Sequence, residues 1–450
     1  MSTAYWCESA WLGGDTVDDA VLVTVDGGVI GAVEVGVQRP AGAVALHGVV
    51  LPGLANAHSH AFHRALRGRT QVGTGSFWTW REQMYAAASR LQPDTYHRLA
   101  RATFAEMALA GVTCVGEFHY LHHDTGGRSY NDPNALGQSL VEAAAAAGIR
   151  ITLLDTCYLH GGLSAEGDYL APNEVQQRFS DGSVERWATR VEAAATLQGP
   201  HCRVGAAVHS VRAVDPTAIA AVASFSAERS MVLHTHLSEQ PAENEQCHAA
   251  HGSTPTQVFA DAGALGQSFS AVHATHLTDT DISLLGGARC TCCFCPTTER
   301  DLADGIGPAA RLLAAGAGLS LGSDSHAVID LLEEARAVEL DERLATNVRG
   351  SHDAASLLRA ATEAGHGSLG WHDAGRIAVG QRADLVAVSM ESVRTAGTSA
   401  IARLATVVFA ATAADVRSVV VDGRLVVDEG RHVSIDVVRE LGSSIQEVFG

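Results

Sequence analysis

Short apolar runs alternate with alanine-rich, helix-like segments through the middle of the chain. Seven runs lie at 111–117, 149–156, 204–209, 232–236, 270–273, 289–295 and 319–324, and an eighth, 48–54, precedes them. The helix-like segments include 96–110, 136–147, 183–197 and 215–226, and the last begins with Asp215-Pro216, a typical helix cap and first turn. Eight strand–helix units over roughly 300 residues predict an α/β fold with a (β/α)₈ TIM-like barrel.

The two ends of the chain carry a different pattern, short apolar strands joined by tight turns. Asp26-Gly27-Gly28 separates 21–25 from 29–33, and Asp422-Gly423 separates two apolar runs between 418 and 427. Asp-Gly between apolar runs is typical of a β-hairpin. With a further strand at 384–388, we expect a small β-sandwich domain from residues 1–48 and 375–450, and a catalytic barrel from residues 49–374.

Composition narrows the class of protein. The apolar fraction of 46% supports a large core. No uninterrupted apolar run has membrane-spanning length, and residues 1–8 show no basic region followed by an apolar one, so we expect neither a membrane span nor a secretion signal. The number of cysteines, nine, is odd, and with no secretion signal in view we expect reduced thiols in a cytoplasmic protein. A net charge of −19 argues against nucleic acid and anionic membranes as partners.

The chain contains no lysine, since all 31 basic residues are arginine. This composition excludes Schiff-base chemistry, a Walker-A phosphate loop and a lysine-derived bridge between two metals. A hydrolytic metal site in this chain must therefore be built from histidine, aspartate, glutamate or cysteine.

Polar residues with metal-binding side chains follow four of the predicted strands. His58 and His60 are two positions apart, so a continuing strand places both imidazoles on one face. His236, His273 and Asp324 each end a later apolar run. Barrels of this type carry their chemistry at the carboxyl ends of the strands. Imidazoles and a carboxylate gathered there suit Zn²⁺.

Spacing alone leaves several assignments open. His234 shares the strand face of His236, so either is a possible ligand. Asp324 is a candidate fourth ligand or general base, and Glu239, three residues after His236, is placed to move protons without binding the metal. Each residue also has an ordinary interpretation as a polar strand end or a cap.

A second cluster has the composition of a thiolate metal site. Cys290-Thr291-Cys292-Cys293-Phe294-Cys295 lacks a distant Cys-x-x-Cys pair and coincides with the seventh run. We therefore expect these cysteines to be buried as small hydrophobic residues.

The set His58-x-His60, His236, His273 and Asp324 resembles the amidohydrolase superfamily, in its mononuclear deaminase branch. The absence of lysine agrees, because the binuclear branch uses a lysine carbamate. The segment 375–386 is similar to the β-sandwich of that superfamily, so the resemblance covers nearly the whole chain. The local motifs resemble those of its deiminases at 57–65, 77–85, 117–123, 209–212 and 296–305.

The resemblance implies a role for each site residue. One Zn²⁺ per subunit, with iron as the other possible metal, would be held by His58, His60, His236 and Asp324. Catalysis would involve Glu239, His273 and Asp324. Substrate binding would involve Arg81, Tyr120, His209, Arg212 and His63.

The implied reaction is the hydrolysis of N-formimino-L-glutamate to N-formyl-L-glutamate and ammonia, in histidine degradation, by a homodimer. The candidate residues suit this reaction. Hydrolysis at a formimino carbon needs an activated water, which a bound metal can supply, and the planar guanidinium groups of arginine suit the two carboxylates of the substrate. Two alternatives stay open. One is another deaminase of the superfamily, acting on guanine or an adenosine-like ring; the other is a non-catalytic metal-binding scaffold.

Overall fold

The computed structural model describes residues 3–75 and 77–449, without the side chains of residues 77 and 78. Its larger part is a closed barrel of eight parallel strands that neighbour one another in chain order: β5 (Leu54–Ser59), β6 (Val112–His119), β7 (Arg150–Cys157), β10 (Cys202–Val208), β11 (Leu233–Leu237), β12 (Phe269–His273), β13 (Thr291–Phe294) and β14 (Gly318–Leu321). A parallel bridge between Ser59 and Asp324 joins the last strand to the first. The predicted barrel is confirmed.

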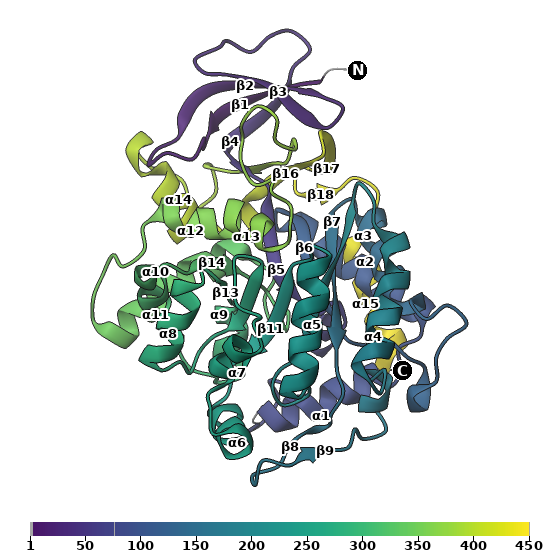
Figure 1. Ribbon diagram of the computed structural model, residues 1–450. Helices are drawn as coiled ribbons and strands as arrows, with labels where there is room; N and C mark the ends of the chain where they lie inside the picture. The colour runs from purple at the N-terminus through teal and green to yellow at the C-terminus, as the bar shows by residue number, and fades with distance from the viewer. Residues whose placement is uncertain (1–2, 76, 450) are drawn as a thin grey trace.

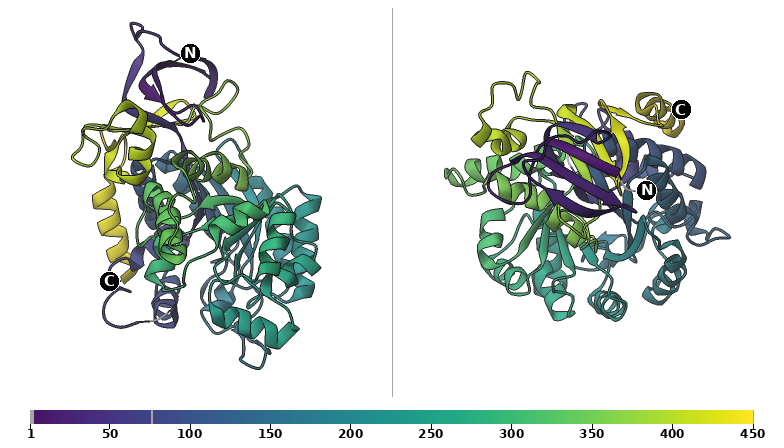
Figure 2. Two further views of the ribbon diagram at one scale, coloured as in Figure 1. Left: turned by 90° about the vertical axis from the view of Figure 1, so that its left-hand side faces the viewer. Right: turned by 90° about the horizontal axis from the view of Figure 1, so that it is seen from above.

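Helices surround this barrel, as the view from above shows (Figure 2). They are α2 (Pro93–Leu109), α3 (Ala135–Ala147), α4 (Val184–Ala194), α5 (Pro216–Glu228), α7 (Pro255–Asp261), α8 (Asp279–Gly287), α10 (Ala309–Ala315), α11 (Leu331–Thr346), α12 (Ala354–Ala361) and α13 (Glu363–Ser368). Asp215 caps α5 as predicted, because its carboxylate accepts hydrogen bonds of 3.1 Å from the amides of Thr217 and Ala218. No helix among the described residues is long and apolar enough to cross a membrane.

Both ends of the chain build one second sheet. Its order is β18 (Arg431–His432), β17 (Arg424–Asp428), β16 (Val416–Val421), β15 (Leu385–Val388), β4 (Val44–Pro52), β1 (Thr3–Ala10), β2 (Asp18–Asp26) and β3 (Val29–Glu34). β4 joins the two ends, since it pairs in parallel with β1 and antiparallel with β15. The expected β-unit from both termini is therefore present, at the top of Figure 1.

The remaining elements lie mainly at the rim of the barrel. α1 (Phe77–Ala88), α6 (Pro241–His251) and the hairpin β8 (Gly162–Leu163)–β9 (Tyr169–Leu170) lie at the end opposite the terminal sheet (Figure 1). α9 (Pro296–Asp301) follows β13, α14 (Arg403–Phe409) precedes β16, and α15 (Val437–Phe449) packs along α2. The strands thus point their carboxyl ends toward α1, α6 and the hairpin.

The apolar run 48–54, predicted as the first barrel strand, is divided between the two sheets. Residues up to Pro52 belong to β4, and β5 begins at Leu54. Gly53 lies between them, where a Cβ would be 2.2 Å from Thr113 Oγ1 and 2.7 Å from Asp384 Cβ. Both strands are buried, so hydrophobicity alone does not locate this break.

A buried ion pair connects the terminal sheet to the barrel. Arg150, the first residue of β7, donates from Nη1 to Asp384 Oδ1 at 3.0 Å and from Nη2 to the other oxygen of the same carboxylate. Burial alone would raise the pKa of Asp384, but the charge of Arg150 outweighs it and lowers that pKa. Arg150 also reaches Asp422 in the turn between β16 and β17, at 3.2 Å.

Candidate active site

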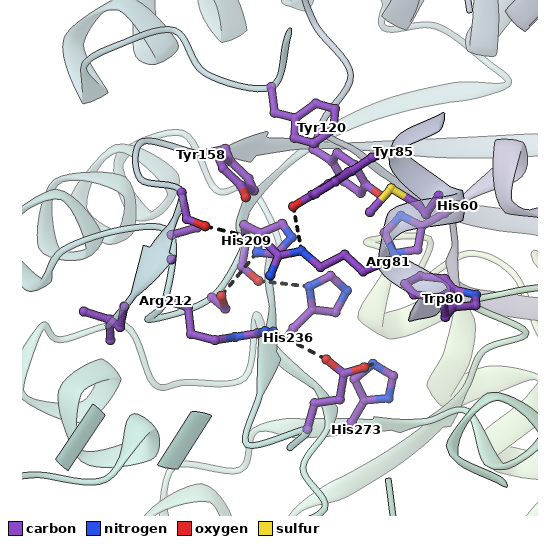
Figure 3. A pocket seen from close by; sticks show the side chains of 18 of the residues that line it. His60, Trp80, Arg81, Tyr85, Tyr120, Tyr158, His209, Arg212, His236 and His273 are labelled. Carbon is purple, nitrogen blue, oxygen red and sulfur yellow. Dashed lines mark hydrogen bonds and ion pairs between the residues drawn. The ribbon is translucent and has the colours of Figure 1, made fainter. Parts of the chain in front are cut away.

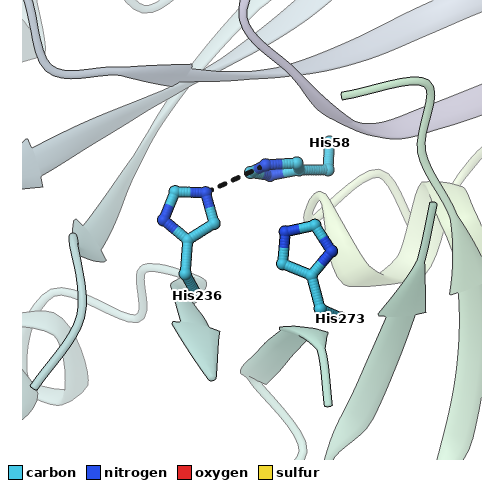
Figure 4. A group of neighbouring side chains, drawn as sticks. All are labelled: His58, His236 and His273. Carbon is cyan, nitrogen blue, oxygen red and sulfur yellow. Dashed lines mark hydrogen bonds between the residues drawn. The ribbon is translucent and has the colours of Figure 1, made fainter. Parts of the chain in front are cut away.

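The four predicted metal ligands converge at the carboxyl ends of β5, β11 and β14. Asp324 Oδ1 lies 3.3 Å from His58 Nε2 and 3.4 Å from His60 Nε2. His58 Nε2 lies 3.2 Å from His236 Nε2, and Figure 4 shows a nitrogen of each ring directed toward the other, with His273 beside them. All of these side chains are buried. Distant segments of the chain thus bring these metal-binding atoms together in two candidate groups that share His58: His58, His60 and Asp324, and His58, His236 and His273.

Backbone carbonyls orient two of these imidazoles. His60 Nδ1 lies 3.0 Å from the carbonyl oxygen of Phe118, and His236 Nδ1 lies 3.0 Å from that of His209. Because a carbonyl only accepts, each Nδ1 carries the hydrogen and each Nε2 keeps its lone pair. Such outer contacts fix the tautomer that binds a metal.

Protonation states in the group also suit a cation. Burial lowers the pKa of His58 and His236, and burial together with neighbouring His58 lowers the pKa of His60 to about 3. Burial would raise the pKa of Asp324, but the hydrogen bond with His58 and the charge of His273 hold it well below its usual value. Neutral imidazoles and an ionised carboxylate are the forms that bind a divalent metal, so the residues fit such an ion.

The structure decides between the two histidines of β11. His234 Nε2 lies 2.8 Å from the carbonyl oxygen of Ser368 in α13, so this ring bonds to the backbone of a neighbouring helix. His236 faces His58. Of the two, only His236 belongs to a candidate metal group, which it forms with His58 and His273.

The predicted proton-transfer residues lie beside this group. His273 Nε2 is 3.8 Å from Glu239 Oε1 and 4.0 Å from Asp324 Oδ2, and its Nδ1 is 3.3 Å from Glu299 Oε1. Burial opposes the charged form of His273, but the charge of Glu239 and the hydrogen bond to Glu299 raise its pKa well above the usual value. His273 and Asp324 have φ of 69° and 37°, a left-handed conformation that costs energy in residues other than glycine and is common at functional sites.

One cavity, of about 180 Å³, contains all five predicted substrate-binding residues. Its walls include His63, Arg81, Tyr120, His209 and Arg212, together with Glu239, His273 and Asp324. Figure 3 shows Arg81, Tyr120, His209, Arg212 and His273 around this cavity. Tyr85 and Trp80 also line the cavity. The candidate metal group and the arginines therefore face the same space.

The two arginines are held differently. Arg81 Nε donates to the hydroxyl of Tyr85 at 2.6 Å, four residues along α1, and Nη2 approaches the carbonyl oxygen of Gly161 at 3.4 Å. Arg212 is buried between two acids, with Nη2 3.5 Å from Glu239 and Nε 3.5 Å from Glu243. Elsewhere in the lining of the cavity, the hydroxyl of Tyr120 lies 3.1 Å from His63 Nε2.

Sequence reasoning missed a buried hydrogen-bond network, here called the seam network, of Ser59, Glu117, Ser323 and His326. Ser59 Oγ, between the two β5 histidines, donates to Glu117 Oε2 at 2.6 Å and lies 3.1 Å from His326 Nε2. His326 Nδ1 lies 2.9 Å from Ser323 Oγ. The network therefore joins the segments on both sides of the barrel closure. The feature of the sequence that could have indicated this network is Glu117, a charged residue that ends an apolar run.

The cysteines behave as small hydrophobic residues. All nine are buried and unpaired, and Cys293 and Cys295 pack with Ala57 and Val272 inside the barrel. Cys295 lies near His273 and Glu299, but burial raises the pKa of its thiol well above the usual value. The prediction that the cysteines of the run 290–295 are buried as small hydrophobic residues is confirmed, and β13 covers 291–294 of that run.

A (β/α)₈ barrel with histidines and an aspartate gathered at its strand ends defines a class of metal-dependent hydrolases. A model of the amidohydrolase family matches residues 49–426, and the chain belongs to that family. It is 38% identical to the formimidoylglutamate deiminase of Pseudomonas aeruginosa, over 87% of each chain. It is 29% identical to the 8-oxoguanine deaminase of the same organism, over 84% of this chain and 83% of that relative.

Solved structures agree with this assignment. An amidohydrolase from Brucella melitensis, 30% identical, superposes with a TM-score of 0.91 over 100% of both chains. An adenosine deaminase from Xanthomonas campestris with bound zinc, 23% identical, has a TM-score of 0.84 over 99% of this chain and 97% of its own, and shows the fold alone. The expected superfamily is confirmed.

Proposed function

We propose that the chain hydrolyses N-formimino-L-glutamate to N-formyl-L-glutamate and ammonia. The observation that carries this proposal is the single cavity that joins the His/Asp group to two guanidinium groups. A neutral purine has no carboxylate for such a pair of arginines, whereas this substrate has two. The similarity to a formimidoylglutamate deiminase supports the same conclusion.

We assign one Zn²⁺ to His58, His60, His236 and Asp324. These residues present three imidazole nitrogens and a carboxylate oxygen in the protonation states described above. A bound Zn²⁺ acts as a Lewis acid and lowers the pKa of water enough for attack at neutral pH. The surrounding residues then determine where the substrate lies and where the protons move.

The glutamate part of the substrate lies, in this proposal, against Arg81 and Arg212. Each guanidinium offers several N–H donors in a plane, which suits the two oxygens of a carboxylate. Tyr120, His209 and His63 line the same cavity and complete the substrate contacts. This arrangement orients the formimino group toward Glu239 and His273.

Hydrolysis requires two proton transfers at the formimino group. The carbon gains the oxygen of water, the bond to the terminal nitrogen breaks, and both hydrogens of water end on that nitrogen, which leaves as ammonia. We assign His273 Nε2, protonated at neutral pH, to orienting the water, and Asp324 Oδ2, 4.0 Å away, to accepting its proton. The carboxyl group of Glu239, 3.8 Å from His273, delivers a proton to the leaving nitrogen.

The test is ammonia release by the purified, Zn²⁺-loaded protein from N-formimino-L-glutamate, with guanine, 8-oxoguanine and an adenosine derivative in parallel. We expect release from the first substrate alone. Ammonia release from a purine alone would be compatible with the proposed metal site but would refute the proposed substrate. If the metal-loaded protein releases ammonia from none of these compounds, the result would favour the hypothesis of a non-catalytic metal-binding scaffold.

Several expectations from the sequence stay predictions. They are zinc as the metal, an anionic small molecule as the ligand, a homodimer, a cytoplasmic location, a place in histidine degradation, and domain boundaries at 48/49 and 374/375. Metal analysis by mass spectrometry and light scattering of the purified protein test the first and third of these directly.

A further inference from the structure

Tyr158 has a hydroxyl hydrogen that no described residue accepts. It follows β7 directly, is buried, and lines the cavity. Its oxygen lies 2.8 Å from Gln176 Nε2, which is its one hydrogen bond among the described residues. Because the amide donates in that contact, the tyrosine oxygen is the acceptor and its own hydrogen is directed elsewhere.

The direction of this hydrogen bond is fixed by two backbone groups. Gln176 Nε2 also lies 2.8 Å from the carbonyl oxygen of Gly161, which only accepts. Gln176 Oε1 lies 3.0 Å from the amide nitrogen of Asn173, which only donates. The side-chain amide therefore has one possible orientation, with its nitrogen toward Tyr158.

The ring of Tyr158 is held on both sides. Its centroid lies 4.7 Å from that of His209 and 5.5 Å from that of Phe179, in edge-to-face arrangements. Burial, together with the nearby Tyr85, raises the pKa of Tyr158 well above its usual value, so the hydroxyl keeps its hydrogen at neutral pH. Figure 3 shows this hydroxyl pointing toward the space where Arg81, His209 and Arg212 meet.

We propose that Tyr158 is a substrate-binding residue that donates its hydroxyl hydrogen to a carboxylate of the substrate, and that Gln176 is the residue that positions it. This inference rests on the proposed function, because it concerns the same cavity. A neutral hydroxyl beside two guanidinium groups suits a carboxylate, which accepts several hydrogen bonds at once. The hydroxyl would add a directional contact to the charge supplied by the arginines.

The test replaces Tyr158 by phenylalanine and measures kcat and KM. With N-formimino-L-glutamate we expect KM to rise about tenfold or more, as for loss of a hydrogen bond to a charged group, and kcat to change little. Two analogues locate the contact: N-formimino-4-aminobutyrate lacks the α-carboxylate, and the N-formimino derivative of L-2-aminobutyrate lacks the γ-carboxylate. The effect of Tyr158→Phe should vanish with one analogue and persist with the other.

Tyr130→Phe is the matched control, because that hydroxyl bonds to Gln92 outside the cavity, at 2.9 Å. Its kinetics should equal those of the wild type. If the wild type turns over the substrate and Tyr158→Phe leaves KM unchanged, the Tyr158 proposal is wrong and the proposed function stands. An equal effect on both analogues and the full substrate would also overturn it, since that outcome indicates a general structural change.

A wild type that releases no ammonia from any formimino compound refutes the proposed function separately. Titration calorimetry with N-formyl-L-glutamate then decides the role of Tyr158. Binding that Tyr158→Phe weakens about tenfold would support the carboxylate contact, and equal binding, or none to either protein, would reject it.

Discussion

Replacing Arg81 by alanine tests whether this end of the cavity binds carboxylates. Arg81 lies on α1, and its guanidinium is held by the hydroxyl of Tyr85 and faces the cavity. It is a cleaner target than Arg212, which lies 3.5 Å from Glu239 and from Glu243. Removing Arg212 would leave two buried acids without their cation and would disturb Glu239 directly.

The expected magnitude follows from the contacts that are lost. A hydrogen bond to a charged group contributes about 1.5–3 kcal/mol, and about 1.4 kcal/mol corresponds to a factor of ten. We therefore expect Arg81→Ala to raise KM for N-formimino-L-glutamate roughly 10- to 150-fold. The value of kcat should stay within about threefold, because Glu239, His273 and Asp324 are unchanged.

Steady-state ammonia release is the assay, with Arg311→Ala as the control. Arg311 pairs with Asp279 on the surface and its side chain is 55% exposed, so its loss should leave both constants unchanged. Arg81→Lys should give a KM between those of the wild type and Arg81→Ala, since lysine keeps the positive charge but lacks the planar guanidinium group. An unchanged KM in a folded Arg81→Ala protein would refute the carboxylate-binding argument.

Three further predictions concern the residues that support the site. Ser59→Ala removes the central hydroxyl of the seam network, and we expect the metal to be lost to a chelator about tenfold faster, measured by metal release over time. Burial raises the pKa of Glu117 to about 8, so the folded protein holds a proton that the unfolded chain releases. The free energy of unfolding of the metal-free protein should therefore fall as pH rises from about 4.5 to 8, by up to about 1.4 kcal/mol per pH unit, and Glu117→Gln should remove this slope in urea titrations. Arg150→Met leaves Asp384 buried without its partner and should cost about 3–5 kcal/mol in the same titrations.

Each of these predictions has a contrary outcome. Equal metal release from Ser59→Ala and from the exposed control Ser89→Ala would mean that the seam network does not support the ligands. A pH slope that persists in Glu117→Gln would assign the proton to another group. A loss below about 1 kcal/mol in Arg150→Met would show that the ion pair with Asp384 does not hold the two sheets together.

The spacing of apolar residues predicted most of the fold, because the formation of strands and helices depends mainly on residues that are close together in the sequence. Alternating strands and helices predict a barrel, and the carboxyl ends of parallel strands must meet at one end of it. The sequence pattern therefore predicts that His58, His60, His236 and Asp324 lie together, and the barrel places them together. The break at Gly53 was not predicted, because the strands on both sides of it are equally apolar.

The sequence by itself determined the kinds of chemistry available: no lysine, a set of histidines and carboxylates at strand ends, and arginines within the cavity motifs. Only the tertiary structure decided between His234 and His236, and only it brought Ser59 to His326 across 267 positions. It also fixed the donor direction at Tyr158 through Gln176. The physical reason is that spacing reports which side of a strand a residue takes, whereas the hydrogen-bond partner of a buried side chain depends on which distant segment the closed barrel places against it.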